Sequence, residues 1–240
     1  MPSPATDHAR RPERMPDALS AHGVVAGYDR RHPVIHDLTV AVQAGETLAL
    51  AGPSGSGKST LARVLSLLHQ PFAGTVHLDG RPVTGYRHRA PRALRTRIGV
   101  VFQQPRLSVD PRMTLRRAIG EPLAAARTPG TPAQVVELAD LVGLTPDLLD
   151  RRAHEVSDGQ LQRACLARAL ALAPGYLICD EMTTMLDAST AAALVAVIRD
   201  YQRRTNAGVL AISHDTVLLD RWADRTLHLT ATGRLPPEHP

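Results

Sequence analysis

The residues that could do chemistry most directly form a glycine-rich segment, Gly52-Pro-Ser-Gly-Ser-Gly-Lys-Ser59. It matches the phosphate-loop pattern GxxxxGK(S/T), and it lies between a strand expected from Glu46 to Ala51 and a helical stretch expected from Lys58 to Leu68. The glycines let backbone amides converge on phosphate oxygens, Lys58 supplies a fixed cation, and the Ser59 hydroxyl can bind Mg²⁺. The segment therefore predicts a binding site for a nucleotide phosphate.

A second segment, Tyr176-Leu-Ile-Cys-Asp-Glu181, is an apolar strand that ends in two acids. Such a strand could deliver Asp180 toward Mg²⁺ and Glu181 toward a water molecule. Taken alone, the pattern is better explained as an ordinary strand-to-turn transition. Because the phosphate loop is also present, we prefer the catalytic interpretation.

A third segment, Val156-Ser-Asp-Gly-Gln160, precedes a helical run from Leu161 to Ala173. Ser157 and Gln160 have the spacing of a capping box, in which each side chain bonds to the other residue's backbone amide. A capped helix start can bind an anion, although a well-capped helix is the default interpretation of this segment in isolation.

Short apolar runs that alternate with helical stretches must position these segments, and this alternation predicts an α/β fold with a largely parallel sheet. We expect a tail over residues 1–20, one domain over 21–232 with a helical insert over about 105–172, and a short tail over 233–240. Strands are expected at 23–26, 38–42, 46–51, 74–80, 98–102, 176–179, 208–212 and 225–229, and further helices over about 188–204 and between the last two strands.

Composition narrows the possible functions. The 240 residues carry a formal charge of +5, but Lys58 is the only lysine, the arginines are scattered and aromatic residues make up 3%, which argues against nucleic-acid binding. No apolar run approaches the roughly 20 residues that span a bilayer, and the N-terminus lacks a signal peptide's apolar region, so we expect a cytoplasmic protein. The isolated Cys165 and Cys179 are expected to be small buried side chains. The eleven histidines are dispersed, and most are expected on the surface.

In their order along the chain, these motifs resemble the nucleotide-binding domain of ABC transporters, from about Val24 to Leu229. The resemblance implies a P-loop NTPase (ABC ATPase) core with a mostly parallel sheet, an antiparallel β subdomain and an inserted helical subdomain, acting on ATP with Mg²⁺. Its implied catalytic residues are Glu181, His214 and Gln103, and its implied metal ligands are Ser59, Gln103 and Asp180. The implied nucleotide contacts are Tyr28, Gly52, Pro53, Ser54, Gly55, Ser56, Gly57, Lys58, Ser59, Thr60, Ser157, Asp158, Gly159, Gln160 and Asp187.

The resemblance also gives roles to residues that would be unremarkable singly. Tyr28 falls where the family places an aromatic ring that stacks on adenine. Gln103 resembles the glutamine that reaches Mg²⁺ and reports to the transmembrane partner, and His214 resembles the switch histidine. Met185-Leu-Asp187 resembles the loop that crosses the interface between two ATPase subunits.

Within the family, residues 102–114 and 160–168 resemble the peptide and nickel importers. In that group two ATPase subunits, usually different, pair beneath two transmembrane permease subunits that an extracytoplasmic solute-binding protein supplies. The resemblance therefore implies a homodimer or, preferably, a heterodimer, held peripherally on the inner face of the cell membrane.

The sequence departs from the family at the signature loop, which usually reads Leu-Ser-Gly-Gly-Gln and here has Val156 and Asp158 at its first and third positions. A carboxylate at a helix N-terminus suits the dipole by up to about 1 kcal/mol, but it would repel a γ-phosphate that docks there. The family's signature loop covers the partner's phosphate loop. We therefore expect one strong and one weaker ATP site in an asymmetric heterodimer.

Two alternatives come from other classes of protein. One is a soluble ABC ATPase of a non-transport complex, such as the phosphonate-degrading assembly. The other is a P-loop small-molecule kinase, which would leave the signature helix and His214 without a role.

Overall fold

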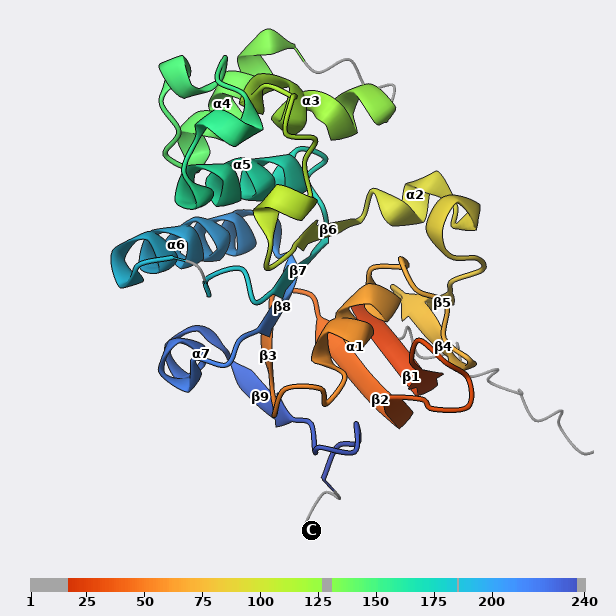
Figure 1. The fold of residues 1–240 in the computed structure, drawn as a ribbon. Helices are drawn as coiled ribbons and strands as arrows, with labels where there is room; N and C mark the ends of the chain where they lie inside the picture. The colour runs from red at the N-terminus through yellow and green to blue at the C-terminus, as the bar shows by residue number, and fades with distance from the viewer. Residues whose placement is uncertain (1–16, 127–130, 185, 237–240) are drawn as a thin grey trace, which may run out of the picture.

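The computed structural model describes residues 17–126, 131–184 and 186–236. Its two sheets and its helices form the layered arrangement of Figure 1, with a central parallel sheet, an antiparallel sheet beside α1 (Lys58–Leu65), and a group of helices beyond β6 (Ile98–Val101). This confirms the predicted fold class of a mostly parallel core with an antiparallel β part and a helical part.

The parallel sheet carries the site. Its strand order is β6 (Ile98–Val101), β7 (Tyr176–Asp180), β8 (Gly208–Ile212), β3 (Thr47–Ala51) and β9 (Arg225–His228). Every residue of β3, β7 and β8 is buried, because these strands lie between neighbours and are covered on both faces. Their continuous apolar runs are therefore the sequence pattern of a central parallel strand.

The antiparallel sheet has the order β2 (Ile35–Gln43), β1 (Ala18–Ala26), β4 (Ala73–Leu78) and β5 (Arg81–Pro82). Strand β1 begins at Ala18, earlier than the expected start of folding at Ala21. The reason is that Leu19 pairs with both Val42 and Leu78 and is 1% exposed. The short run Ala18-Leu19 before Ser20 gave no periodicity from which to predict this.

Helix α1 (Lys58–Leu65) follows the phosphate loop and packs against β1 and the parallel sheet. The expected helix extended to Leu68, but Leu67 has a φ of 62°, which a right-handed helix does not allow. On the other face of the parallel sheet lie α6 (Ala188–Thr205) and α7 (Thr216–Trp222), close to their expected positions.

The chain between β6 and β7 is mainly helical. Its elements are a 3₁₀ helix (Pro105–Leu107), α3 (Leu115–Ala125), α4 (Pro132–Leu141), two more 3₁₀ helices (Pro146–Leu148 and Ala153–Glu155) and α5 (Asp158–Leu170). Sequence reasoning did not predict α2 (Arg92–Arg95) or the 3₁₀ helix Arg87–Arg89, which precede β6.

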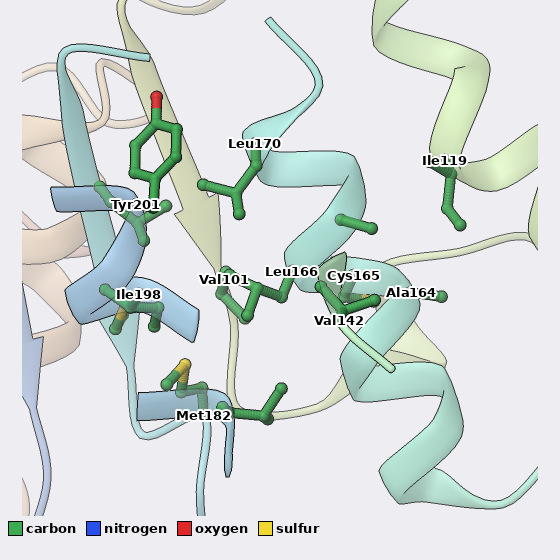
Figure 2. Packing of buried hydrophobic residues seen from close by; sticks show 14 of the residues in the cluster. Val101, Ile119, Val142, Ala164, Cys165, Leu166, Leu170, Met182, Ile198 and Tyr201 are labelled. Atoms are coloured by element: carbon green, nitrogen blue, oxygen red, sulfur yellow. The ribbon is translucent and has the colours of Figure 1, made fainter. Parts of the chain in front are cut away.

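Two hydrophobic clusters divide the core, because successive residues of each strand point to opposite faces. Tyr176 and Ile178 of β7 pack toward α1 and the antiparallel sheet, whereas Leu177 and Cys179 pack toward α5 and α6. Figure 2 shows the cluster on the side of α5 and α6, with Leu166 of α5 beside Val101 of β6. Within the described ranges, no helix combines the length and apolarity that crossing a membrane requires.

Candidate nucleotide site

The phosphate loop connects the end of β3 to the start of α1, as the sequence predicts. Gly57 has a φ of 99°, and a Cβ there would lie 2.9 Å from Ile35 Cγ1, so this turn requires glycine. Pro53, Ser54 and Gly55 are exposed at the tip, whereas Ser56, Gly57, Lys58 and Thr60 are buried. The loop thus presents its tip to solvent and is anchored at its base.

Lys58 is the cation of this loop, and it is 7% exposed. Its Nζ donates hydrogen bonds to the carbonyl oxygens of Gly52 (2.8 Å) and Pro53 (2.9 Å). These bonds hold the ammonium group under the loop, where an anionic phosphate is the ligand that its charge suits. Among the described residues, the buried Ser56 hydroxyl beside it has no hydrogen-bond partner.

Ser59 and Asp180 bring two oxygen donors together from α1 and β7. The Ser59 hydroxyl donates to Asp180 Oδ1 at 3.0 Å. Burial raises the pKa of Asp180, while the hydrogen bond from Ser59 opposes that rise. A hydroxyl beside a buried carboxylate is a set of hard oxygen donors, the type that Mg²⁺ prefers.

Glu181, Gln103 and His214 meet beyond the carboxyl ends of β7, β6 and β8. Gln103 Nε2 donates to Glu181 Oε2 at 2.9 Å, and His214 Nδ1 lies 3.7 Å from the same oxygen. The three strands are neighbours and parallel, so residues that directly follow them share one edge of the sheet. The sequence placed each residue after its strand, and the structure brings all three together.

Tyr28 is at the edge of this region and is 74% exposed. Its hydroxyl accepts a hydrogen bond from Arg63, one turn along α1 from Ser59. Arg63 in turn borders a cavity that Ser59, Gln103 and Asp180 also line. The tyrosine is therefore connected to the phosphate loop through α1, and its largely exposed ring has Arg63 Cζ 5.9 Å from its centroid.

The predicted capping box is present at the start of α5. The Gln160 amide donates to Ser157 Oγ (3.2 Å), and the Ser157 amide donates to Gln160 Oε1 (3.0 Å). A Cβ on Gly159 would lie 3.7 Å from Leu186 and 3.8 Å from Thr190, so this turn is beside the start of α6. In the described part of the chain, these side chains bond within their own region and not to the phosphate loop.

Asp187 caps α6, and its carboxylate accepts hydrogen bonds from Ser189 Oγ (2.5 Å), Thr190 N (2.9 Å) and Thr190 Oγ1 (2.7 Å). These bonds, that from Ser189 first, hold the pKa of Asp187 far below its usual range. Its expected contact with nucleotide stays a prediction. Met185, named with it in the sequence, lies outside the described residues.

Sequence reasoning missed Arg106, whose guanidinium is bonded to Asp158 at 2.7 Å. The two residues are 52 positions apart, and no local pattern relates them. The available signal was the acidic residue where the family has glycine, because a carboxylate attracts a nearby cation. Asp158 is therefore not the unpaired charge on which the expected repulsion rested.

The remaining predictions concern cysteine and histidine. Cys165 and Cys179 are free and buried, as expected, and burial raises the pKa of the Cys165 thiol to about 11. Of the nine histidines that the structure describes, five are exposed and four are partly buried.

Comparison with known proteins agrees with this geometry. A family model described as "ABC transporter" matches residues 35–184. The nickel import ATP-binding protein NikE of Rhodospirillum rubrum is 40% identical over 210 residues, which cover 86% of this chain and 76% of that protein. NikE of Brucella suis biovar 1 (strain 1330) is 38% identical, with 86% of this chain and 79% of that protein covered.

Solved structures share the fold. The dimeric structure of MJ0796, a bacterial ABC transporter cassette, superposes with a TM-score of 0.80 at 23% identity, covering 91% of this chain and 97% of that one. A post-hydrolysis state of the same cassette, bound to ADP and Pi, gives a TM-score of 0.79 at 24% identity, covering 92% and 97%. Fold and site together define a phosphate-loop ATPase. The chain belongs to the ABC transporter family, as an ATP-binding and ATP-hydrolysing member.

Proposed function

We propose that this protein is the ATPase subunit of an ABC importer and works as half of a nucleotide-sandwich dimer on the inner face of the cell membrane. The observation that carries the proposal is the meeting of Gln103, Glu181 and His214 beyond the phosphate loop. Nickel is the preferred cargo, because the matched relatives are nickel import ATP-binding proteins, and a small peptide is the alternative.

The chain's own residues divide the work of hydrolysis. The phosphate loop binds the ATP phosphates through its amides and Lys58, and Tyr28 stacks on the adenine. Glu181 accepts a proton from the attacking water, while Gln103, already bonded to Oε2, fixes the direction of that carboxylate. His214 contacts the γ-phosphate and orients the same water, so positioning and electrostatics supply most of the rate.

Mg²⁺ fits the donors that the structure presents, namely the Ser59 hydroxyl and the buried Asp180 carboxylate, with Gln103 on the adjacent strand end. When bound, the ion supplies positive charge that offsets charge on the transferred phosphoryl group. The raised pKa of Asp180 is consistent with this assignment, because a buried carboxylate gains most from a nearby cation.

The membrane partners would dock beside the site. A cavity of about 710 Å³ lies next to Ser59 and Asp180, and Gln103, Gln104, Leu107 and Ser108 line it from the segment that follows β6. Leu107 is 82% exposed at the rim of this cavity, so its apolar side chain is available to a partner. We assign residues 103–114 to the surface that receives a transmembrane permease subunit. In the proposed assembly a second ATPase subunit pairs with this one, and a solute-binding protein delivers cargo to the permeases from the other side of the membrane.

The test compares Glu181→Gln with Glu137→Gln, an exposed control on α4. Phosphate release is measured on the purified chain alone and with its membrane subunits, and nickel uptake is measured in cells that carry each variant. We expect Glu181→Gln to lose at least about 100-fold in turnover, because it removes the base, and to keep ATP binding. Equal turnover of both variants would refute the catalytic assignment. Unchanged nickel uptake in cells without the chain would refute the cargo.

A further inference from the structure

Asp158 is the first residue of α5, and its carboxylate lies where the family's signature loop has glycine. Its side chain is 49% exposed, and that of Arg106 is 44% exposed. An ion pair this exposed contributes little to stability by itself. Its importance depends on where the charge lies and on what else the arginine binds.

Arg106 uses all three of its guanidinium nitrogens at this turn. Nε donates to Asp158 Oδ1 at 2.7 Å, Nη1 to the Ala153 carbonyl at 2.8 Å, and Nη2 to the Val156 carbonyl at 2.8 Å. The Arg106 guanidinium therefore binds the backbone that leads into α5 as well as the Asp158 carboxylate. A lysine, with a single nitrogen, could not make this set from one geometry.

The segment that holds Arg106 is itself attached to α5 on either side. Gln162 Nε2 donates to the Phe102 carbonyl at 3.1 Å, and Arg168 Nη1 donates to the Ser108 carbonyl at 2.6 Å. Gln162 is 1% exposed, so the first attachment is shielded from water. Residues 102–108 are therefore joined to α5 at three points along its length: Arg106 binds at the helix start, Gln162 lies further along the helix, and Arg168 lies in its last turn.

We propose that Arg106 is a positioning residue for the ATP site that this chain's signature turn completes: it neutralises Asp158 and fixes the turn Val156–Gln160, so that the turn accepts the γ-phosphate of ATP bound to the partner subunit. The inference rests on the proposed dimer. On this inference the ATP site next to Asp158 is not weakened as the sequence suggested, because Arg106 of the same chain offsets the negative charge of Asp158. An uncompensated carboxylate near the phosphate would weaken ATP-dependent pairing by about tenfold.

The test uses Glu181→Gln as the background, which is expected to retain ATP and accumulate the sandwich. The variants are Arg106→Met, Asp158→Asn and the two together. Arg116→Met is the matched control, since it breaks another exposed arginine–aspartate pair, with Asp150 at 2.9 Å. For each protein, alone and mixed with a candidate partner ATPase subunit, light scattering gives the ATP concentration at which dimer formation is half-maximal. Binding of mant-ATP reports each chain's own phosphate loop.

Arg106→Met should raise the half-maximal ATP concentration about tenfold without changing mant-ATP affinity. Higher salt should reduce that defect, because salt screens exposed charges. Asp158→Asn and the double variant should both stay within about threefold of the background, and so should Arg116→Met.

An Arg106→Met protein that matches Arg116→Met would overturn the inference. A double variant as impaired as Arg106→Met would also overturn it, because tethering alone would then explain the defect. The inference would also be overturned if the Glu181→Gln protein bound mant-ATP but stayed monomeric, both alone and mixed with the partner subunit. In that case the pairing of Arg106 with Asp158 would not have made the turn able to accept the phosphate. Loss of mant-ATP binding by every protein, the unmutated chain included, would instead refute the proposed function on which the inference depends.

Discussion

Asp180 and Asp187 are seven residues apart, but their surroundings shift the pKa values of their carboxyl groups in opposite directions. Asp180 is 5% exposed, and burial raises its pKa. Asp187 is on the surface at the start of α6, and hydrogen bonds from Ser189 and Thr190 lower its pKa. The folded protein therefore binds a proton more readily than the unfolded chain at Asp180, and less readily at Asp187.

The same substitution should shift stability in opposite directions at these two residues. Asp180→Asn should stabilise the nucleotide-free protein at pH 7, because it removes a buried charge and can keep the hydrogen bond from Ser59. A gain of about 1 kcal/mol in the free energy of unfolding would raise the thermal midpoint by ~2–4 °C. Asp187→Asn should lower the midpoint, since a neutral amide replaces a carboxylate that accepts three hydrogen bonds. Differential scanning calorimetry measures both, and shifts of the same sign would contradict the argument.

The pH dependence follows from the two directions. The lowered pKa of Asp187 contributes stability that is present above its ordinary pKa and is lost as pH falls through the folded value. The raised pKa of Asp180 has the opposite effect, since its cost appears as pH rises above the ordinary value. The deficit of Asp187→Asn should therefore stay constant between pH 5 and pH 8, which calorimetry at several pH values checks.

At the scale of single residues, the sequence could indicate that Gln103, Glu181 and His214 lie near one another, because each of them follows a strand of the parallel sheet. The sequence showed that each of these residues follows its strand. Because the three strands are adjacent and parallel, their carboxyl ends lie at one edge of the sheet and bring the three side chains together. Arg106 could not be found in this way. Its partners are Asp158 and two carbonyls, and a bond between residues so far apart in sequence depends on how the helical region folds back on β6.

Helix α5 is the element on which the helical region and the parallel sheet both depend. Leu166 and Leu161 are fully buried in the cluster that joins α3, α5, α6 and the sheet. Figure 2 places Leu166 next to Val101, with Ile198 and Met182 on one side and Ile119 of α3 on the other. A cavity at Leu166 would therefore loosen several elements at once.

Leu166→Ala should destabilise the protein by about 2–5 kcal/mol, the usual cost of emptying a buried leucine site. Leu107→Ala is the matched control, because that side chain is 82% exposed and should change stability by less than about 0.5 kcal/mol. Urea unfolding followed by far-ultraviolet circular dichroism measures both. If Leu107→Ala were as costly as Leu166→Ala, the core would not lie where Figure 2 shows it.

Element boundaries were predicted best where burial is complete. Strands β3, β7 and β8 are buried throughout and mostly apolar, so sequence alone found them within one residue. The errors fall where tertiary contacts decide the boundary, as at Ala18, where β1 begins because it pairs on both sides, and at Leu67, where a positive φ ends α1. Short elements such as α2 have too few residues to show a period.

In the whole molecule, the exposed segment after Gln103 connects the catalytic edge of the sheet to the surface proposed for the permease. Gln103 contacts Glu181, and Leu107 borders the adjacent cavity. A partner that presses on this segment would therefore act on the carboxylate through a few residues of backbone. If the proposed docking is correct, this arrangement would give a physical route from the permease subunit to hydrolysis.

Leu107→Asp should disrupt that route without unfolding the chain. The substitution replaces an exposed apolar side chain with a charge, so the thermal midpoint should stay within about 2 °C of the unmutated protein. Binding to the membrane subunits should weaken at least about tenfold, since a buried unpaired charge is costly at an interface. Co-purification and the stimulation of phosphate release are the measurements. Full stimulation of the variant would rule out this docking surface.

The order of the parallel sheet also bears on how the protein is made. Strand β3, which carries the phosphate loop, is paired with β8 on one side and β9 on the other, and both come from residues 208–228. At the usual speed of translation, roughly 8 to 30 s separate the synthesis of β3 from that of β8. During that interval the nascent chain has its nucleotide loop but neither neighbouring strand. Ribosome-bound chains should therefore gain the ability to bind ATP only after the last strands emerge.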